Sequence, residues 1–108
     1  MSVVNLAVEP LSPAGLDPTR TGSLSTDNQY YFPNNGMTLL HFQKSGATNC
    51  TVTIHGLDAG DDIEVVVPAT TGDVMIGPIP PTKYNDGDGK VESTLSNITG
   101  LTVAVVSL

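Results

Sequence analysis

A strict alternation of apolar and polar side chains over residues 48–55 constrains the fold of this chain more than any other feature. Cys50, Val52 and Ile54 alternate with threonine, asparagine and histidine, which predicts a β-strand with one buried face and one exposed face. Threonine, valine and isoleucine also suit the pleated, half-buried surface of a sheet. Because no window carries the apolar stripe of an amphipathic helix, the chain is expected to be all-β.

The same strand is predicted to belong to a β-hairpin over residues 35–55. Residues 37–42 would form the first strand, and the polar segment 43–46 with its terminal glycine would form the turn. Residues 48–55 would then return antiparallel to the first strand. We expect the other strands to be arranged around this hairpin.

Composition limits the architecture further. The length of 108 residues fits one domain, and a chain with 11 glycines, 8 prolines and no tryptophan must build its core from valine, isoleucine and leucine. Short strands separated by glycine and proline turns are typical of a sandwich or barrel. The sequence predicts an all-β, single-domain β-sandwich or jelly-roll-like barrel. Its N-terminal strand and Pro/Gly-rich arm would span residues 1–35, and its core residues 36–108.

Further strands and connections follow from the same pattern. Residues 3–8 are predicted to form a first strand that Pro10 ends, because proline has no N–H group for pairing. The proline-rich segment 77–89 is predicted to be a rigid crossover between two sheets. Later strands are expected over residues 63–67, 74–76, 90–95 and 101–108.

The segment 11–35 has the composition of a loop, yet so long a structureless stretch is unusual inside a compact domain. Two interpretations remain open: it contains short edge strands, most plausibly over residues 26–32, or it is an arm that becomes ordered against a neighbour. Tyr30, Tyr31 and Phe32 raise a similar choice. They would either cap one end of the core or form a subunit contact, since aromatic residues are enriched in interfaces.

The last predicted strand is apolar on both faces, which indicates that both faces are covered. The covering element would be a partner chain or a folded-over arm. The two sets of side chains are Leu101, Val103 and Val105 on one face, and Ala104, Val106 and Leu108 on the other.

The acidic charge balance excludes some partners. A formal net charge of -7 argues against nucleic acid, whose binding depends on lysine and arginine at phosphates, and against an anionic membrane surface. No apolar stretch approaches the roughly 20 residues that a membrane-spanning helix needs. We therefore predict neither a nucleic-acid nor a membrane partner.

Candidate reactive groups are few. Cys50 shares a face with apolar neighbours, which predicts a buried, inert thiol. His55 points to the other face, and His41 could reach Cys50 only across the hairpin, with no orienting group beside it. Neither histidine has the closely spaced partner ligands that zinc sites usually show. We predict no catalytic residue, no cofactor and no metal, and hence a protein that is not an enzyme.

An aspartate- and glycine-rich segment over residues 84–89 hints at a calcium loop. It fails the EF-hand spacing, because the loop's first position would be Tyr84 and its twelfth would be Leu95. A tight turn is expected there, with a loose calcium site at Asp86 and Asp88 as the alternative.

Three stretches carry a resemblance to a known family: residues 32–46 (FPNNGMTLLHFQKSG), 76–85 (IGPIPPTKYN) and 100–108 (GLTVAVVSL). They resemble small β-rich proteins encoded among the head genes of tailed bacteriophages, and residues 13–16 fit the same pattern loosely. These motifs are turns and strand ends, so no functional residue transfers from the family by a chemical motif.

The resemblance implies a capsid decoration protein on the exterior of the virion. Such proteins are β-sandwich or jelly-roll-like domains, often trimeric, that bind the major capsid protein and brace the shell. Two alternatives remain: a head-completion or tail protein, and a carbohydrate- or cell-surface-binding module supported by Tyr84 beside Asp86 and Asp88.

Subunit or capsid contacts are predicted on the N-terminal segment, the tyrosines, the proline-rich corner and the last strand. The predicted contact residues are Val3, Val4, Leu16, Tyr30, Tyr31, Pro78, Pro80, Pro81, Tyr84, Ala104, Val106 and Leu108.

Overall fold

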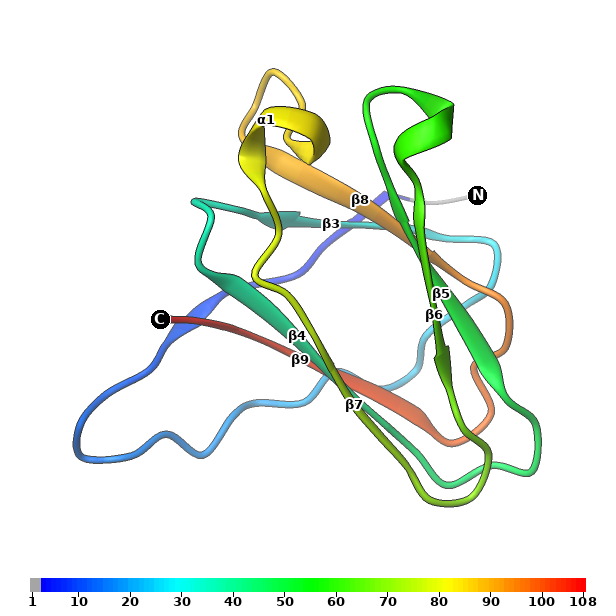
Figure 1. The fold of residues 1–108 in the computed structure, drawn as a ribbon. Coiled ribbons are helices and arrows are strands. Elements are labelled where there is room, and N and C mark those ends of the chain that lie inside the picture. The colour runs from blue at the N-terminus through cyan, green and yellow to red at the C-terminus, as the bar shows by residue number, and fades with distance from the viewer. Residues whose placement is uncertain (1–2) are drawn as a thin grey trace.

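Two β-sheets pack face to face in the computed structural model of the protein, which describes residues 3–108 (Figure 1). This arrangement confirms the predicted all-β sandwich. Besides the strands, the described residues include the short 3-10 helix η1 (Ala59–Asp61) and the one-turn helix α1 (Pro81–Tyr84). The strands are β1 (Val3–Asn5), β2 (Glu9–Pro10), β3 (Gln29–Pro33), β4 (Thr38–Lys44), β5 (Cys50–His55), β6 (Ile63–Val67), β7 (Gly72–Ile76), β8 (Lys90–Leu95) and β9 (Leu101–Ser107).

The two sheets have different strand orders. Sheet A has the order β1-β3-β8-β5-β6, and sheet B has the order β2-β9-β4-β7. Pairing is antiparallel except at the N-terminal edges, where β1 lies parallel to β3 and β2 lies parallel to β9. The N-terminal segment therefore contributes an edge strand to each sheet.

The hairpin predicted over residues 35–55 is wrong in its pairing, although both of its strands exist. β4 lies in sheet B between β9 and β7, whereas β5 lies in sheet A between β8 and β6. Residues 45–49 carry the chain from one sheet to the other. A short polar loop with a glycine suits either connection, and the strands that decide between them, β8 and β9, come from the far end of the sequence.

The N-terminal strand predicted over residues 3–8 is divided between the sheets. Leu6 is buried where the chain crosses over, and Val4 and Val8 pack against the core, which confirms the predicted common face of these three residues. Pro10 ends β2 at the edge of sheet B beside Ser107, where a missing N–H group is harmless.

The strand expected over residues 26–32 is found as β3, but it is not an edge strand. It pairs with β1 on one side and with β8 on the other. Its alternating side chains Tyr30 and Phe32 are 3% and 0% exposed and belong to the core. These two rings therefore fill the interior, as the first of the two aromatic interpretations predicted.

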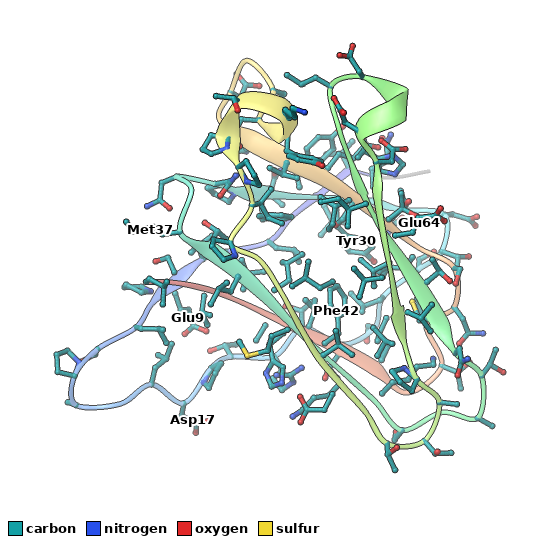
Figure 2. All side chains as sticks on the ribbon, in the orientation of Figure 1. Glu9, Asp17, Tyr30, Met37, Phe42 and Glu64 are labelled. Atoms are coloured by element: carbon teal, nitrogen blue, oxygen red, sulfur yellow. The ribbon has the colours of Figure 1, made fainter. Side chains whose placement is uncertain are left out.

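The core lies between the sheets and follows the predicted alternation. Cys50, Val52 and Ile54 of β5 are fully buried, facing a layer that includes Leu40 and Phe42 of β4. Burying an aliphatic or aromatic side chain of this size stabilises a fold by about 1.5–3 kcal/mol. Figure 2 shows side chains, Phe42 and Tyr30 among them, in the space between the two layers.

Residues 77–89 cross from β7 in sheet B to β8 in sheet A, as predicted. The side chain of Ile79 in this crossover is buried and closes one side of the sandwich. The buried Asn34 holds this crossover in place. Its amide nitrogen donates to the Ile79 carbonyl (3.0 Å) and to Oδ1 of Asn85 (2.8 Å). Its own Oδ1 accepts from the Gly36 amide at 3.0 Å.

The opposite end of the sandwich is closed by Lys44, which is 3% exposed. Its ammonium group donates to Oδ1 of Asn97 (2.8 Å) and to the Thr99 carbonyl (2.6 Å). The Ser45 amide donates to the Gly100 carbonyl at 3.0 Å, so the crossover after β4 lies directly against the turn before β9.

Candidate interaction surface

Residues 11–20, called the arm from here on, leave sheet B at one end of β9 and rejoin it further along the same strand (Figure 1). Thr21 forms an antiparallel bridge with Val103, with N–H···O distances of 2.7 and 3.0 Å. The Glu9 carboxylate accepts hydrogen bonds from the Thr19 amide (2.7 Å) and hydroxyl (3.3 Å). The arm is mostly exposed between these attachments.

The side chain of Arg20 fixes the end of the arm across β9 and β4. Its Nε donates to Oγ1 of Thr102 at 2.8 Å, and Nη2 donates to the His41 carbonyl at 2.9 Å. Its Nη1 lies 3.1 Å from Nδ1 of His41. Burial lowers the pKa of Arg20, while Asp73 opposes that change. Arg20 thus attaches the arm to sheet B through both backbone and side-chain acceptors.

The partners of His41 define its protonation. Arginine has donors only, so Nδ1 of His41 must accept from Arg20, and the ring hydrogen sits on Nε2. Nε2 then donates to Oδ1 of Asp73, and this hydrogen bond lowers the pKa of Asp73. His41 in this arrangement is therefore neutral.

Arg20, His41, Asp73 and Thr102 are not arranged as a hydrolytic triad. Both nitrogens of His41 are occupied by Arg20 and Asp73, and the Thr102 hydroxyl is bonded to Arg20 instead of to the imidazole. A nucleophile must be within hydrogen-bond reach of its base. The cluster is a clamp that holds the arm.

Both faces of β9 are covered within this chain. Leu101, Val103 and Val105 face the core, while Ala104 and Val106 on the opposite face are 1% and 4% exposed. The arm follows this edge of β9, and Arg20 reaches Thr102 on the same face. Ala104 and Val106 are thus buried within this chain, on the face of β9 that Arg20 reaches.

An exposed apolar row lies at the end of sheet B where the arm begins. Leu11, Leu108 and Met37 are 44%, 65% and 54% exposed. The Leu108 amide donates to the Met37 carbonyl (3.0 Å), and the Leu11 amide donates to the Ser107 carbonyl (2.8 Å). The three residues therefore lie directly beyond the ends of the neighbouring strands β2, β4 and β9, which are about 4.8 Å apart from one strand to the next. Figure 2 shows Met37 at this end, on the same side of the molecule as Glu9.

The predicted contact residues do not form one surface. Four are buried in the chain itself and offer little surface to a partner while the fold is intact: Tyr30, Tyr84, Ala104 and Val106. Three are half-buried: Val4, Leu16 and Tyr31. Five are exposed, and among them Leu108 belongs to the apolar row: Val3, Pro78, Pro80, Pro81 and Leu108.

Tyr84 cannot act as the exposed aromatic platform that the carbohydrate alternative requires. It is 8% exposed, and its hydroxyl donates to the Asp61 carbonyl at 2.6 Å, joining α1 to η1. Tyr31 is the ring that lies on an outer face, in register with Asn5 and Glu92 on sheet A. Burial raises the pKa of Tyr31, as do the nearby Glu92 and Asp86 carboxylates.

The outer face of sheet A is polar. Two adjoining hollows of about 280 and 100 Å³ share His55 and Glu92 along this face. His55 is held by the hydroxyl of Thr94, 2.8 Å from Nε2. The hydrogen bond from Gln29 to Glu92, at 2.8 Å, links β3 to β8. The side chains of this face thus mainly bond to one another across the sheet.

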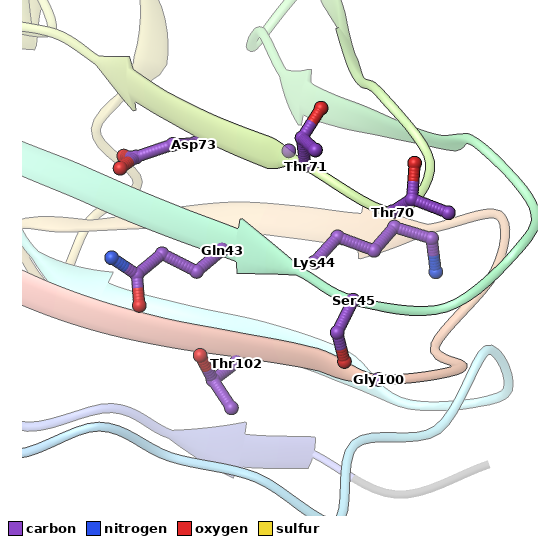
Figure 3. A pocket seen from close by; sticks show the side chains of 9 residues that line it. Gln43, Lys44, Ser45, Thr70, Thr71, Asp73, Gly100 and Thr102 are labelled. Carbon is purple, nitrogen blue, oxygen red and sulfur yellow. The ribbon is translucent and has the colours of Figure 1, made fainter.

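A larger hollow of about 330 Å³ lies on sheet B beside the clamp (Figure 3). Figure 3 shows Asp73, Gln43 and Thr102 on the adjacent strands β7, β4 and β9. The neighbouring Lys44 already donates to Asn97 and Thr99. The hollow is a shallow polar surface with hydroxyl, amide and carboxylate groups, and it continues the clamp toward the closed end of the sandwich.

The remaining candidate groups serve the fold. Oδ1 of Asp86 accepts from the amides of Asp88 (2.8 Å) and Lys90 (3.1 Å), which closes the predicted turn. Within residues 3–108, no group of three or more histidine, cysteine, aspartate or glutamate side chains is arranged to hold a metal ion. Cys50 is a buried free thiol. The described part of the chain contains no helix long and apolar enough to cross a membrane.

The sequence interpretation missed the clamp and most of the apolar row. Arg20, His41 and Asp73 come from three separate segments, and only the pairing of β4 with β7 and β9 brings them together. A weak signal existed, because Arg20 is the single arginine of the chain and stands in the loop segment. The strand predicted over residues 37–42 includes Met37, and its sequence pattern gives no indication that this side chain is exposed.

Comparisons with protein-family models, with curated proteins and with solved structures found no match to this chain.

Proposed function

We propose that this protein is a non-enzymatic decoration protein of a tailed-bacteriophage head. It binds the major capsid protein on the exterior of the virion and stabilises the shell, and it acts as a homo-trimer. The resemblance of residues 32–46, 76–85 and 100–108 to phage head proteins is the starting point. The all-β sandwich fits that resemblance, and the rest of the support comes from the surface.

The observation that carries the proposal is the apolar row at the start of the arm. Leu11, Met37 and Leu108 are exposed at adjoining strand ends, whereas single exposed apolar side chains are ordinary on any protein. A contiguous apolar group beside an exposed loop suits a contact with another protein. Such a contact can be weak, because capsid symmetry repeats it many times.

The polar groups support a structural role. His41, Asp73 and Lys44 each form hydrogen bonds to other groups of the fold. A clamp and a closed sandwich end are what a bracing protein needs, since cementing depends on a rigid shape with many contacts.

The test is a binding experiment with empty, expanded heads assembled from the major capsid protein of the same genome. Wild-type protein is mixed with the heads, and the bound copies per head are counted after sedimentation. We expect hundreds of copies, and a head that resists heat better than the bare one. A dozen or fewer copies would instead indicate a head-completion or tail protein, and no binding would refute the proposal.

Matched variants locate the contact. The double variant Met37→Gln, Leu108→Gln removes most of the apolar row, while Leu57→Gln, Val66→Gln removes two equally exposed apolar side chains elsewhere. We expect the first pair to weaken binding at least tenfold and the second to leave it unchanged. Light scattering of the free protein reports whether the trimer exists before binding.

A further inference from the structure

We propose that the clamp at His41 is a pH-sensitive latch: protonation of His41 detaches Arg20, and the arm is then released from sheet B. This inference is independent of the proposed function, because it concerns hydrogen bonds within one chain.

The clamp depends on which ring nitrogen of His41 carries a hydrogen. Nη1 of Arg20 can only donate, and it faces Nδ1 of His41 at 3.1 Å. The contact therefore exists only while Nδ1 is unprotonated. A second ring hydrogen would place two donors, each on a positively charged group, against one another at hydrogen-bond distance. The contact then changes from attraction to repulsion.

The other groups around His41 decide which contact is lost. Asp73 on β7 binds Nε2, which carries a hydrogen in both protonation states, so this bond survives and is strengthened by charge. Opposite His41, β9 offers Ala104 and β7 offers Met75, neither of which is charged. Lys44, on the same strand, turns its side chain into the sandwich end. Arg20 is thus the group expelled, and β4 stays paired with β7.

The loss of Arg20 leaves the arm weakly attached. Two of its other bonds go to the His41 and Thr102 carbonyls, and these require the guanidinium to stay beside the charged ring. Beyond them, the end of the arm is held by the Thr21–Val103 bridge and by Glu9.

The direction of the effect follows from histidine chemistry. A histidine ordinarily gains its second hydrogen around pH 6.5. The latch is closed while Nδ1 of His41 is unprotonated and opens when falling pH adds the second hydrogen. Asp73 keeps its charge over the range tested, since its pKa is lowered from 3.8.

The bridge itself provides the measurement. The amides of Thr21 and Val103 donate to each other's carbonyls, so their hydrogen-exchange protection reports arm attachment. Protection factors, corrected for intrinsic exchange, are measured by NMR at pH 7.5 and 5.5. We expect at least a tenfold loss at pH 5.5 for these two amides. The amides of Val52 and Ile54 in β5 serve as internal references that should not change.

Two histidine variants supply the matched comparison. His41→Gln cannot titrate but can still accept from Arg20 and donate to Asp73, so its protection should not depend on pH. His55→Gln alters the other histidine, on sheet A, and should keep the wild-type response. Unchanged protection in the wild type, or a pH response that survives His41→Gln, would overturn the latch.

A measurement on the wild type guards against a misfolded variant. The nitrogen chemical shifts of the His41 ring distinguish its tautomers. At pH 7.5 we expect the hydrogen on Nε2, as the Arg20 and Asp73 contacts require. A ring that carries its hydrogen on Nδ1 at that pH would refute the proposal without any substitution.

Discussion

Replacing Gly46 with alanine tests the sheet-to-sheet crossover directly. Gly46 follows β4 in the connection that carries the chain into sheet A, and its carbonyl accepts from the Thr70 amide at 2.7 Å. A Cβ atom at this position would stand 2.2 Å from the Thr99 carbonyl oxygen and 2.8 Å from its carbon. The obstacle is backbone, which cannot turn aside as a flexible side chain can.

The size of the effect follows from that distance. Cβ atoms essentially never approach another heavy atom within 3.0 Å, so the new Cβ and the Thr99 oxygen must separate by at least 0.8 Å, the difference between 3.0 and 2.2 Å. Overpacking of this kind costs about 1–3 kcal/mol. The same oxygen accepts from buried Lys44 at 2.6 Å, and weakening that charged hydrogen bond adds to the loss. We expect Gly46→Ala to lower the free energy of unfolding by about 2–4 kcal/mol.

The assay is urea unfolding followed by circular dichroism, with Gly22→Ala as the control. An added Cβ at Gly22 meets no atom within 4 Å, and its φ lies outside the left-handed region. The control should unfold within about 0.5 kcal/mol of the wild type, or be slightly more stable. If Gly46→Ala proved as stable as Gly22→Ala, the close approach of the crossover to Thr99 would be refuted.

Three further predictions concern single side chains. The pKa of Tyr31 is raised above 10.0 by burial first, and then by the Glu92 and Asp86 carboxylates. The stability that this neutral phenol contributes is therefore complete below pH 10, and it is lost as the pH rises through the folded-state pKa. Tyr31→Phe should therefore remove part of the alkaline destabilisation in thermal melts between pH 9 and 11, and identical wild-type and variant profiles would contradict this. Cys50 should not react with a thiol reagent until the protein unfolds, and Cys50→Ser should cost about 1–3 kcal/mol because it buries a hydroxyl among apolar groups. Rapid labelling of the folded protein would disprove its burial. Lys44→Met should destabilise the fold by about 1–3 kcal/mol, since the Thr99 carbonyl loses its ammonium donor; a variant as stable as the wild type in urea would show that this bond contributes little.

The strands were predictable because each carries its own local signal. β8 matches the predicted residues 90–95, and β6 matches residues 63–67, because alternation and turn residues mark their boundaries. What the sequence could not show is which strands pair. The segment 43–49 looks like a hairpin turn, but β4 binds β9 and β5 binds β8, more than 35 residues away in each case. Such pairing depends on packing across the whole chain, which local periodicity does not contain.

The candidate surface was less predictable than the fold. The apolar residues on both faces of β9 correctly predicted that both faces are covered, because a buried face of a strand is apolar and an exposed face is polar. Alternation could not show what covers the second face, because loop paths leave no periodic signal. The tyrosines illustrate the same limit: Tyr30 and Tyr31 are adjacent in sequence, yet one is in the core and the other on an outer face. Their burial is decided by alternation along β3, while interface composition alone treats them alike.

The last strand, β9, connects the first part of the chain with the last part. β9 pairs with β4 along its length, accepts β2 at one end and the Thr21 bridge toward the other, and buries side chains on both faces. Sheet B is therefore complete only when the first and last parts of the chain meet. Contacts between such distant segments must overcome loop-closure entropy before they stabilise the fold. The arm sits at this late junction and is held there by Arg20 on His41 and Thr102, by Glu9 and by the Thr21–Val103 bridge. Because none of residues 11–20 belongs to the core cluster, opening of the proposed latch would detach the arm without loss of the core.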